Sequence, residues 1–217
     1  MSRRTLATLG AVGALAACAS SAEARAQSLE GTGRVTLTGG WRYTPNDYFQ
    51  GRAAEAGFTA SPSAGGPQAV GTFAYAATSS LEVAVDLFAG AERIELAGTK
   101  PLSSATYGAM IGFRSFWPLG AEGTVVPNAG LALGPMLAWT TGGPEDVSTE
   151  RLATVYAASA GVSVRLSETF GLALDVRYLL ARGLVPGISG INMGGLWAGV
   201  GATWFLPGEP SRRGAVR

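Results

Sequence analysis

The stretch FGLALDVRYLLAR at residues 170–182 decides the fold of this chain, because it sorts two kinds of side chain by strict alternation. Every second residue from Phe170 to Leu180 is large and apolar, whereas the residues between them, apart from Leu179, are small or charged and include Asp175 and Arg177. A two-residue period is the pattern of a β-strand, whose successive side chains point to opposite faces of the sheet. Residues 170–182 therefore predict a strand with one apolar face and one face of small and ionised groups.

The same alternation recurs from Arg34 onward, in short runs separated by clusters of Gly, Pro, Ser and Asn, and no 3.6-residue period is sustained. We predict an all-β chain of eight antiparallel strands, near residues 34–43, 68–77, 81–91, 104–117, 126–139, 152–166, 170–182 and 195–205. The connectors after the second, fourth and sixth strands are short, and the others are longer. This layout is typical of an up-and-down transmembrane β-barrel with tight periplasmic turns and extended outer loops.

Eight charged residues of the predicted strands fall on the parity opposite to the large apolar residues. They form a predicted lumen charge network of Arg34, Arg42, Glu82, Asp86, Arg114, Arg165, Asp175 and Arg177. An arginine or lysine facing lipid at the bilayer midplane costs roughly 2–4 kcal/mol, so a marginally stable barrel would not tolerate eight outward charges. We therefore expect the charges to face inward and the apolar parity to face lipid.

A soluble eight-stranded barrel with a ligand cavity is the rival architecture, and it requires a polar outer face. Here the polar parity is mostly Gly, Ala and Ser, and Lys100 is the single lysine of the chain. Such a face is a poor surface for a sheet in water. Small residues do suit a narrow lumen, because an eight-stranded barrel has just enough interior for side chains to fill.

Aromatic residues on the lipid parity gather near both ends of the predicted strands, as in the girdles of membrane barrels. The predicted girdles are Trp117, Phe170 and Trp204 beside the short turns, and Trp41, Tyr43, Tyr107, Trp139 and Tyr156 beside the long loops. Several residues do not fit. The exceptions are Phe88, Phe116, Trp197 and Phe205 on the inward parity, Phe73 and Tyr75 in an ambiguous second strand, and Pro135, which lacks a ladder donor.

The amino terminus predicts a cleaved export signal, with basic Arg3 and Arg4 followed by an uncharged stretch. Cleavage after Ala26 is favoured by an A-x-A site, and lipidation of Cys18 in a lipobox-like run is the alternative. The expected organisation is a signal peptide at 1–26, a periplasmic lead-in at 27–33, the barrel at 34–205 and a periplasmic tail at 206–217. After cleavage at Ala26 no cysteine remains, so burial or lipid must supply the stability.

Composition narrows the function. The 16 basic and 15 acidic side chains argue against a nucleic-acid binder, and the absence of histidine removes every mechanism built on imidazole. We expect no enzyme activity, no metal and no cofactor. Three acidic residues of the third loop, Glu145, Asp146 and Glu150, lack the interleaved Asn, Asp and Gly of a calcium loop.

The signal peptide, the eight strands, the alternating connectors and the last strand resemble the small outer-membrane barrels of Gram-negative bacteria, namely the OmpA transmembrane domain, OmpX and OmpW. Within that strand Gly199, Ala202, Trp204 and Phe205 partly match the family's carboxy-terminal insertion signal. The resemblance implies a protein of the outer membrane, in contact with its lipid and with the barrel assembly machinery during insertion. The family commonly ends on the terminal aromatic, whereas this chain continues to Arg217. We expect a monomer.

Two functional hypotheses follow. The inward charges predict a structural network that braces the lumen of a surface scaffold, and the alternative is a narrow channel for ions or small hydrophobic solutes, as OmpW-type barrels are thought to be. The fourth long loop is unusually apolar and is a candidate to cover the mouth or to contact a hydrophobic ligand. Its apolar residues are Leu184, Val185, Ile188, Ile191 and Met193.

Overall fold

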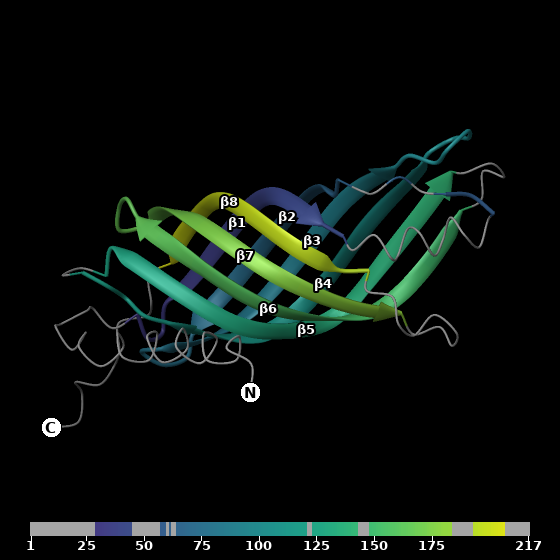
Figure 1. Ribbon diagram of the computed structural model, residues 1–217. Coiled ribbons are helices and arrows are strands. Elements are labelled where there is room, and N and C mark those ends of the chain that lie inside the picture. The colour runs from purple at the N-terminus through teal and green to yellow at the C-terminus, as the bar shows by residue number, and fades with distance from the viewer. Residues whose placement is uncertain are drawn as a thin grey trace, which may run out of the picture.

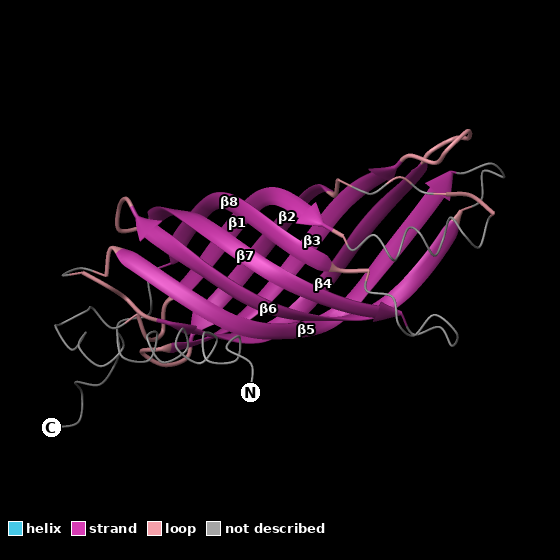
Figure 2. Ribbon diagram, viewed as in Figure 1, coloured by secondary structure: helices cyan, strands magenta, loops and turns pink. Residues whose placement is uncertain are grey.

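The computed structural model describes residues 29–44, 57–59, 61, 64–120, 123–142, 148–183 and 193–206, and within them the chain forms one closed barrel (Figure 1). Each strand pairs antiparallel with its sequence neighbour, and the last strand pairs with the first. The strands run steeply oblique to the long axis of the barrel, and Figure 2 shows that strands make up its whole wall. No helix in the described ranges is long and apolar enough to cross a membrane.

The predicted strands are all present, and their ends differ from the observed ones by at most three residues. The strands are β1 Gly33–Tyr43, β2 Gly66–Ala76, β3 Leu81–Ile94, β4 Leu102–Phe116, β5 Val125–Gly142, β6 Thr149–Arg165, β7 Phe170–Gly183 and β8 Gly195–Leu206. Gly33 and Leu206 pair with each other, so the barrel includes one residue that was assigned to the lead-in and one assigned to the tail.

The alternation read from the sequence separates the outside of the barrel from its inside. Leu131 is 72% exposed and Phe113 is 62% exposed on the outer face, whereas Asp86 is 1% exposed. The ambiguous second strand follows the same rule, because Phe73 and Tyr75 are both exposed. Large apolar residues thus cover the outer wall, which is the arrangement of a barrel in lipid.

Pro135 lies on the outer face of β5, where the ladder to β4 is interrupted. The register pairs Gly108 with Met136 and Ile111 with Leu133, and no pair of these two strands is formed between them. Proline has no N–H to donate, so the ladder loses a bond at this point of an otherwise closed sheet.

The interior is filled by two kinds of layer. Most ion pairs occupy the half nearer the short turns, and a buried apolar cluster that includes Phe88, Met136 and Trp197 lies beyond them toward the long loops, where the pair of Arg42 and Glu92 also lies. At the short-turn end, Leu29 packs against a second cluster of Ala76, Phe116 and Val126.

Candidate functional site

The centre of the charged layer is the carboxylate of Asp86 on β3. Arg114 of β4 donates from Nη2 to both of its oxygens, at 2.6 and 2.8 Å, and Nη1 of Arg177 lies 2.8 Å from Oδ2. The hydroxyl of Thr72 on β2 donates to Oδ1. These partners come from three strands, so the buried carboxylate on β3 ties together β2, β3, β4 and β7 by charge-assisted hydrogen bonds.

Arg177 extends this network along β7. Its Nη2 lies 2.6 Å from Oδ2 of Asp175, and its Nε donates to the same oxygen at 2.8 Å. The guanidinium is 2% exposed and lies 5.6 Å from the ring centroid of Trp197. Two carboxylates and one aromatic ring therefore surround a cation that would otherwise be costly to bury.

Two further pairs brace the lumen outside this centre. Arg34 of β1 pairs with Glu82 of β3 and also lies 3.4 Å from the hydroxyl of Ser163 on β6. Arg42 pairs with Glu92 at 3.7 Å, and Nη1 of Arg42 donates to the hydroxyl of Thr106 at 2.8 Å.

Glu92 was missed by the sequence reading because the predicted third strand ended at residue 91. In the structure β3 continues to Ile94, which places Glu92 on the same inward parity as Glu82 and Asp86. A predicted strand one residue longer would have included Glu92. Its side chain is fully buried and accepts a hydrogen bond from Thr44 at 2.8 Å.

Arg165, which was predicted to join the charge network, lies against inward-facing Phe205 but forms no ion pair in the part of the chain that the structure describes. It ends β6 near the short turns, where it is only half-buried, and its guanidinium lies 4.3 Å from the ring centroid of Phe205. Within the described ranges the lumen pairs therefore join Arg34, Arg42, Arg114 and Arg177 to Glu82, Asp86, Glu92 and Asp175. Four cations meet four anions, so the network is neutral.

The inward aromatic residues that did not fit the sequence pattern fill the lumen. Trp197 is fully buried and donates from its indole to the carbonyl of Gln68 at 3.2 Å. A side chain at Gly199 would collide with this ring, and a Cβ at Gly108 would come within 2.6 Å of the ring of Phe88. The glycines on the inner face thus make room for aromatic rings as well as for arginines.

The predicted girdles lie on the outer face with one exception. At the long-loop end Trp41, Tyr43, Tyr107, Trp139 and Tyr156 are all exposed. At the other end Phe170 and Trp204 form an edge-to-face pair with centroids 5.9 Å apart. Trp117 lies beyond the end of β4 and is half-buried, so it is not a strand residue of the girdle.

The rest of the predicted site residues lie largely outside the described residues. These are Cys18, Leu184, Val185, Ile188 and Ile191. Met193 is described: it is 4% exposed, packs in the apolar lumen cluster and donates its N–H to the carbonyl of Ala181 at 3.0 Å. No group of three or more potential metal ligands occurs in the described part of the chain.

Solved structures with the same fold come from small outer-membrane barrels. The outer membrane protein OprG from Pseudomonas aeruginosa covers 82% of this chain and 96% of its own length, with a TM-score of 0.54 and 13% identity. Ail, the attachment invasion locus protein of Yersinia pestis, covers 82% and 99%, with a TM-score of 0.53 and 13% identity. Neisserial surface protein A covers 82% of this chain and 97% of its own length, with a TM-score of 0.50 and 14% identity.

No protein-family model and no curated protein sequence matches the chain. At these identities the solved structures speak to the fold alone. On that level the resemblance read from the sequence is confirmed: the chain has the fold of the small outer-membrane β-barrels.

Proposed function

We propose that this chain is a non-enzymatic integral protein of the Gram-negative outer membrane, a surface scaffold whose lumen is closed by its own side chains. The single observation that carries the proposal is the filled interior. Trp197, Arg177, Phe116 and Met136 are among the largest fully buried side chains, and all four point into the barrel. A pore needs a continuous path of water, whereas here packed and ion-paired side chains fill the lumen along the barrel axis.

The outward belt supports the membrane location. Its residues are apolar along every strand, and aromatic residues border it at both ends, which is the surface that lipid requires. The structural similarity to barrels of the outer membrane agrees with this location. Outer-membrane lipid is thus the proposed main partner, with the barrel assembly machinery acting during insertion and a monomer as the working state.

The network geometry supports a bracing role over a gating one. Asp86 receives two arginines and a threonine, so breaking one contact leaves the others in place. Removing one partner of a buried pair is costly because the other charge stays behind unpaired. The absence of histidine from the whole sequence argues against the acid–base chemistry on which most hydrolytic sites depend.

Planar-bilayer conductance tests the closed lumen. Wild-type protein, checked for folding by its faster migration on gels when unheated, is expected to give no stable current steps. A variant carrying Phe88→Ala, Met136→Ala and Trp197→Ala removes much of the apolar layer and should produce small steps. Stable conductance of the wild type would refute the proposal.

A second candidate function is a route for small hydrophobic solutes through the barrel wall between β4 and β5. It is favoured by the interrupted ladder at Pro135, which lies beside the apolar cluster of Met110 and Met136. In this case vesicles containing wild-type protein would take up a small apolar solute faster than empty vesicles, and Pro135→Val, which restores the missing N–H, would slow the uptake. Equal uptake in all three preparations would exclude this candidate.

A further inference from the structure

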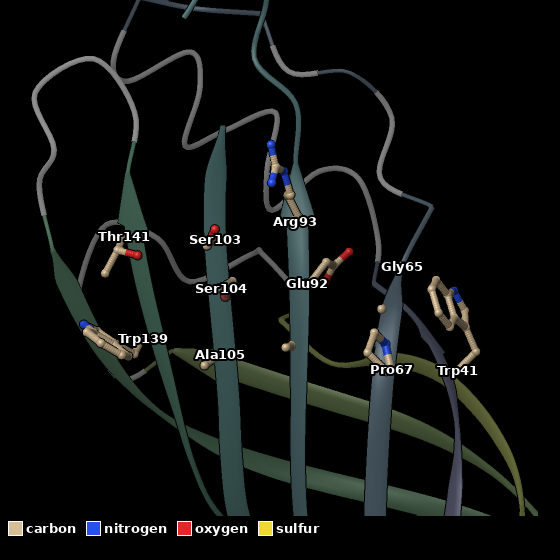
Figure 3. Close-up of a pocket in the computed structure, with 12 residues that line it drawn as sticks. Trp41, Gly65, Pro67, Glu92, Arg93, Ser103, Ser104, Ala105, Trp139 and Thr141 are labelled. Carbon is tan, nitrogen blue, oxygen red and sulfur yellow. The ribbon is translucent and has the colours of Figure 1, made fainter. Parts of the chain in front are cut away.

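A groove of about 440 Å³ lies on the outer wall, near the long-loop end of the barrel (Figure 3). Its floor is formed by Pro67 of β2, Ala91 of β3 and Ala105 of β4, and its two sides are Trp41 of β1 and Trp139 of β5. A volume of roughly 300–1,000 Å³ is usual for pockets that hold a small molecule.

The strand register explains why the groove exists. Trp41 pairs with Pro67, Ala91 pairs with Ala105, and Ala105 pairs with Trp139. The row therefore runs across five strands with a tryptophan at each end and only small side chains between them. Strands lie about 4.8 Å apart, so the two tryptophans are held roughly 19 Å apart along the wall.

Both tryptophans are held in place by hydrogen bonds. The indole of Trp41 donates to the carbonyl of Ala64 at 2.7 Å, and the indole of Trp139 donates to the hydroxyl of Ser148 at 2.6 Å. Both sides of the groove are thus held in place without a ligand, which lowers the entropic cost of binding.

A cation and two hydroxyl-bearing residues lie at the long-loop rim of the groove. Arg93 stands next to Ser103 in the register, and Thr141 follows on β5. Arg93 uses Nε for an ion pair with Glu95 at 3.0 Å, and both side chains are more than 60% exposed. Such an exposed pair contributes little to stability, and the structure gives the two Nη groups no partner among the described residues, so they remain available to an anion.

We propose that this groove binds one phosphate-bearing lipid of the outer leaflet, with an acyl chain between Trp41 and Trp139 and the phosphate at Arg93. The proposal goes beyond the scaffold function and rests only on its membrane location. The chemistry fits at both ends, because an apolar floor flanked by aromatic rings receives hydrocarbon and a guanidinium donates to phosphate oxygens. An acyl chain is also what the outer wall of a membrane barrel meets.

Quenching of tryptophan fluorescence tests the site in vesicles of phosphatidylcholine. The protein carries Trp117→Phe and Trp204→Phe, so that Trp41 and Trp139 report the groove while buried Trp197 contributes a constant signal. The quencher is a lipid brominated near the headgroup end of its acyl chains, either anionic phosphatidylglycerol or zwitterionic phosphatidylcholine. Half-maximal quenching is expected at a roughly three- to tenfold lower mole fraction of phosphatidylglycerol, which corresponds to the net strength of one ordinary hydrogen bond.

Variants separate the groove from general attraction to the membrane. Arg93→Gln should abolish the preference, and Glu95→Gln should increase it because the competing carboxylate is gone. Ala91→Phe with Ala105→Phe should fill the groove and remove the preference. Ala158→Phe, at an exposed outward position of β6, and Lys100→Gln, a loop cation outside the groove, are the matched controls and should retain it.

The outcomes are distinct. Quenching by both lipids to the same extent in the parent protein would overturn the groove proposal while leaving the membrane location intact, whereas no quenching by either would overturn the location as well. A preference that survives Arg93→Gln would also refute the proposal. Cross-linking of two chains through the groove, with no preference between the two lipids, would overturn the proposal and identify a second copy as the occupant.

Discussion

Replacing Asp86 by alanine should be among the most damaging single changes in the lumen. The substitution leaves Arg114 without its bidentate partner and leaves Arg177 with Asp175 alone, while all of these groups stay in the barrel. Leaving one partner of a buried ion pair uncompensated costs about 3–5 kcal/mol. That loss is a large fraction of the roughly 5–15 kcal/mol by which proteins of this size are stable.

Urea unfolding in lipid vesicles, followed by tryptophan fluorescence and by the gel shift of folded barrels, measures the loss. Glu95→Ala is the matched control, because it breaks a carboxylate–arginine pair that is exposed, and it should cost less than about 1 kcal/mol. The double variant Asp86→Ala with Arg114→Ala should recover part of the loss, since the stranded cation is removed. A loss for Asp86→Ala that is no larger than that of Glu95→Ala would refute the buried network as a stabilising element.

Three further results are expected from the same measurements. Leu131→Arg places a charge on the outer wall and should cost roughly 2–4 kcal/mol in vesicles, and a neutral effect would mean that this face is not in lipid. Gly199→Leu should prevent the gel shift of folded protein, because its side chain would occupy the space of the Trp197 ring; normal folding would show that the ring has another position. Arg165→Gln should change the free energy of unfolding by less than about 1 kcal/mol, since it has no carboxylate partner among the described lumen pairs, and a loss comparable to that of Asp86→Ala would return Arg165 to the network.

The face on which each strand residue lies could be predicted from the sequence because it depends on parity alone. Asp86, Arg114 and Arg177 were assigned to the inside on this basis, and Leu131 and Tyr156 to the outside. A one-residue error in register would have exchanged every one of these assignments, so the agreement excludes a one-residue slip.

The position of a residue along the barrel axis could not be predicted in the same way. Parity gave Arg165 the inner face, but it did not reveal that the residue ends its strand at the rim, where its guanidinium lies over the ring of Phe205. Glu92 was lost for the opposite reason, because a strand end placed three residues too early excluded it. Strand ends are set by competition between ladder bonds and loop entropy, which leaves only a weak trace in residue type.

The packing of large residues against small ones across the lumen could also not be predicted from the sequence. Trp197 and Phe88 have inward parity in a barrel too narrow for many rings, and the pattern alone gave no reason for them to be there. The structure supplies the reason in Gly199 and Gly108, which come from β8 and β4. Such complementarity joins residues that lie on different strands or on the same strand two positions apart, and only their three-dimensional arrangement reveals it.

A filled lumen moves the functional surface of this protein to its exterior. Because the five ion pairs and the apolar layer leave little interior space for a solute, we expect recognition at either the long-loop end or the outer wall. On that wall the row between Trp41 and Trp139 is distinguished by three small side chains under a cation, whereas the wall elsewhere carries large residues such as Leu131 and Phe113. The rigid interior and the exterior groove are therefore linked, since a wall braced from inside keeps the two tryptophans at a fixed separation before a ligand binds.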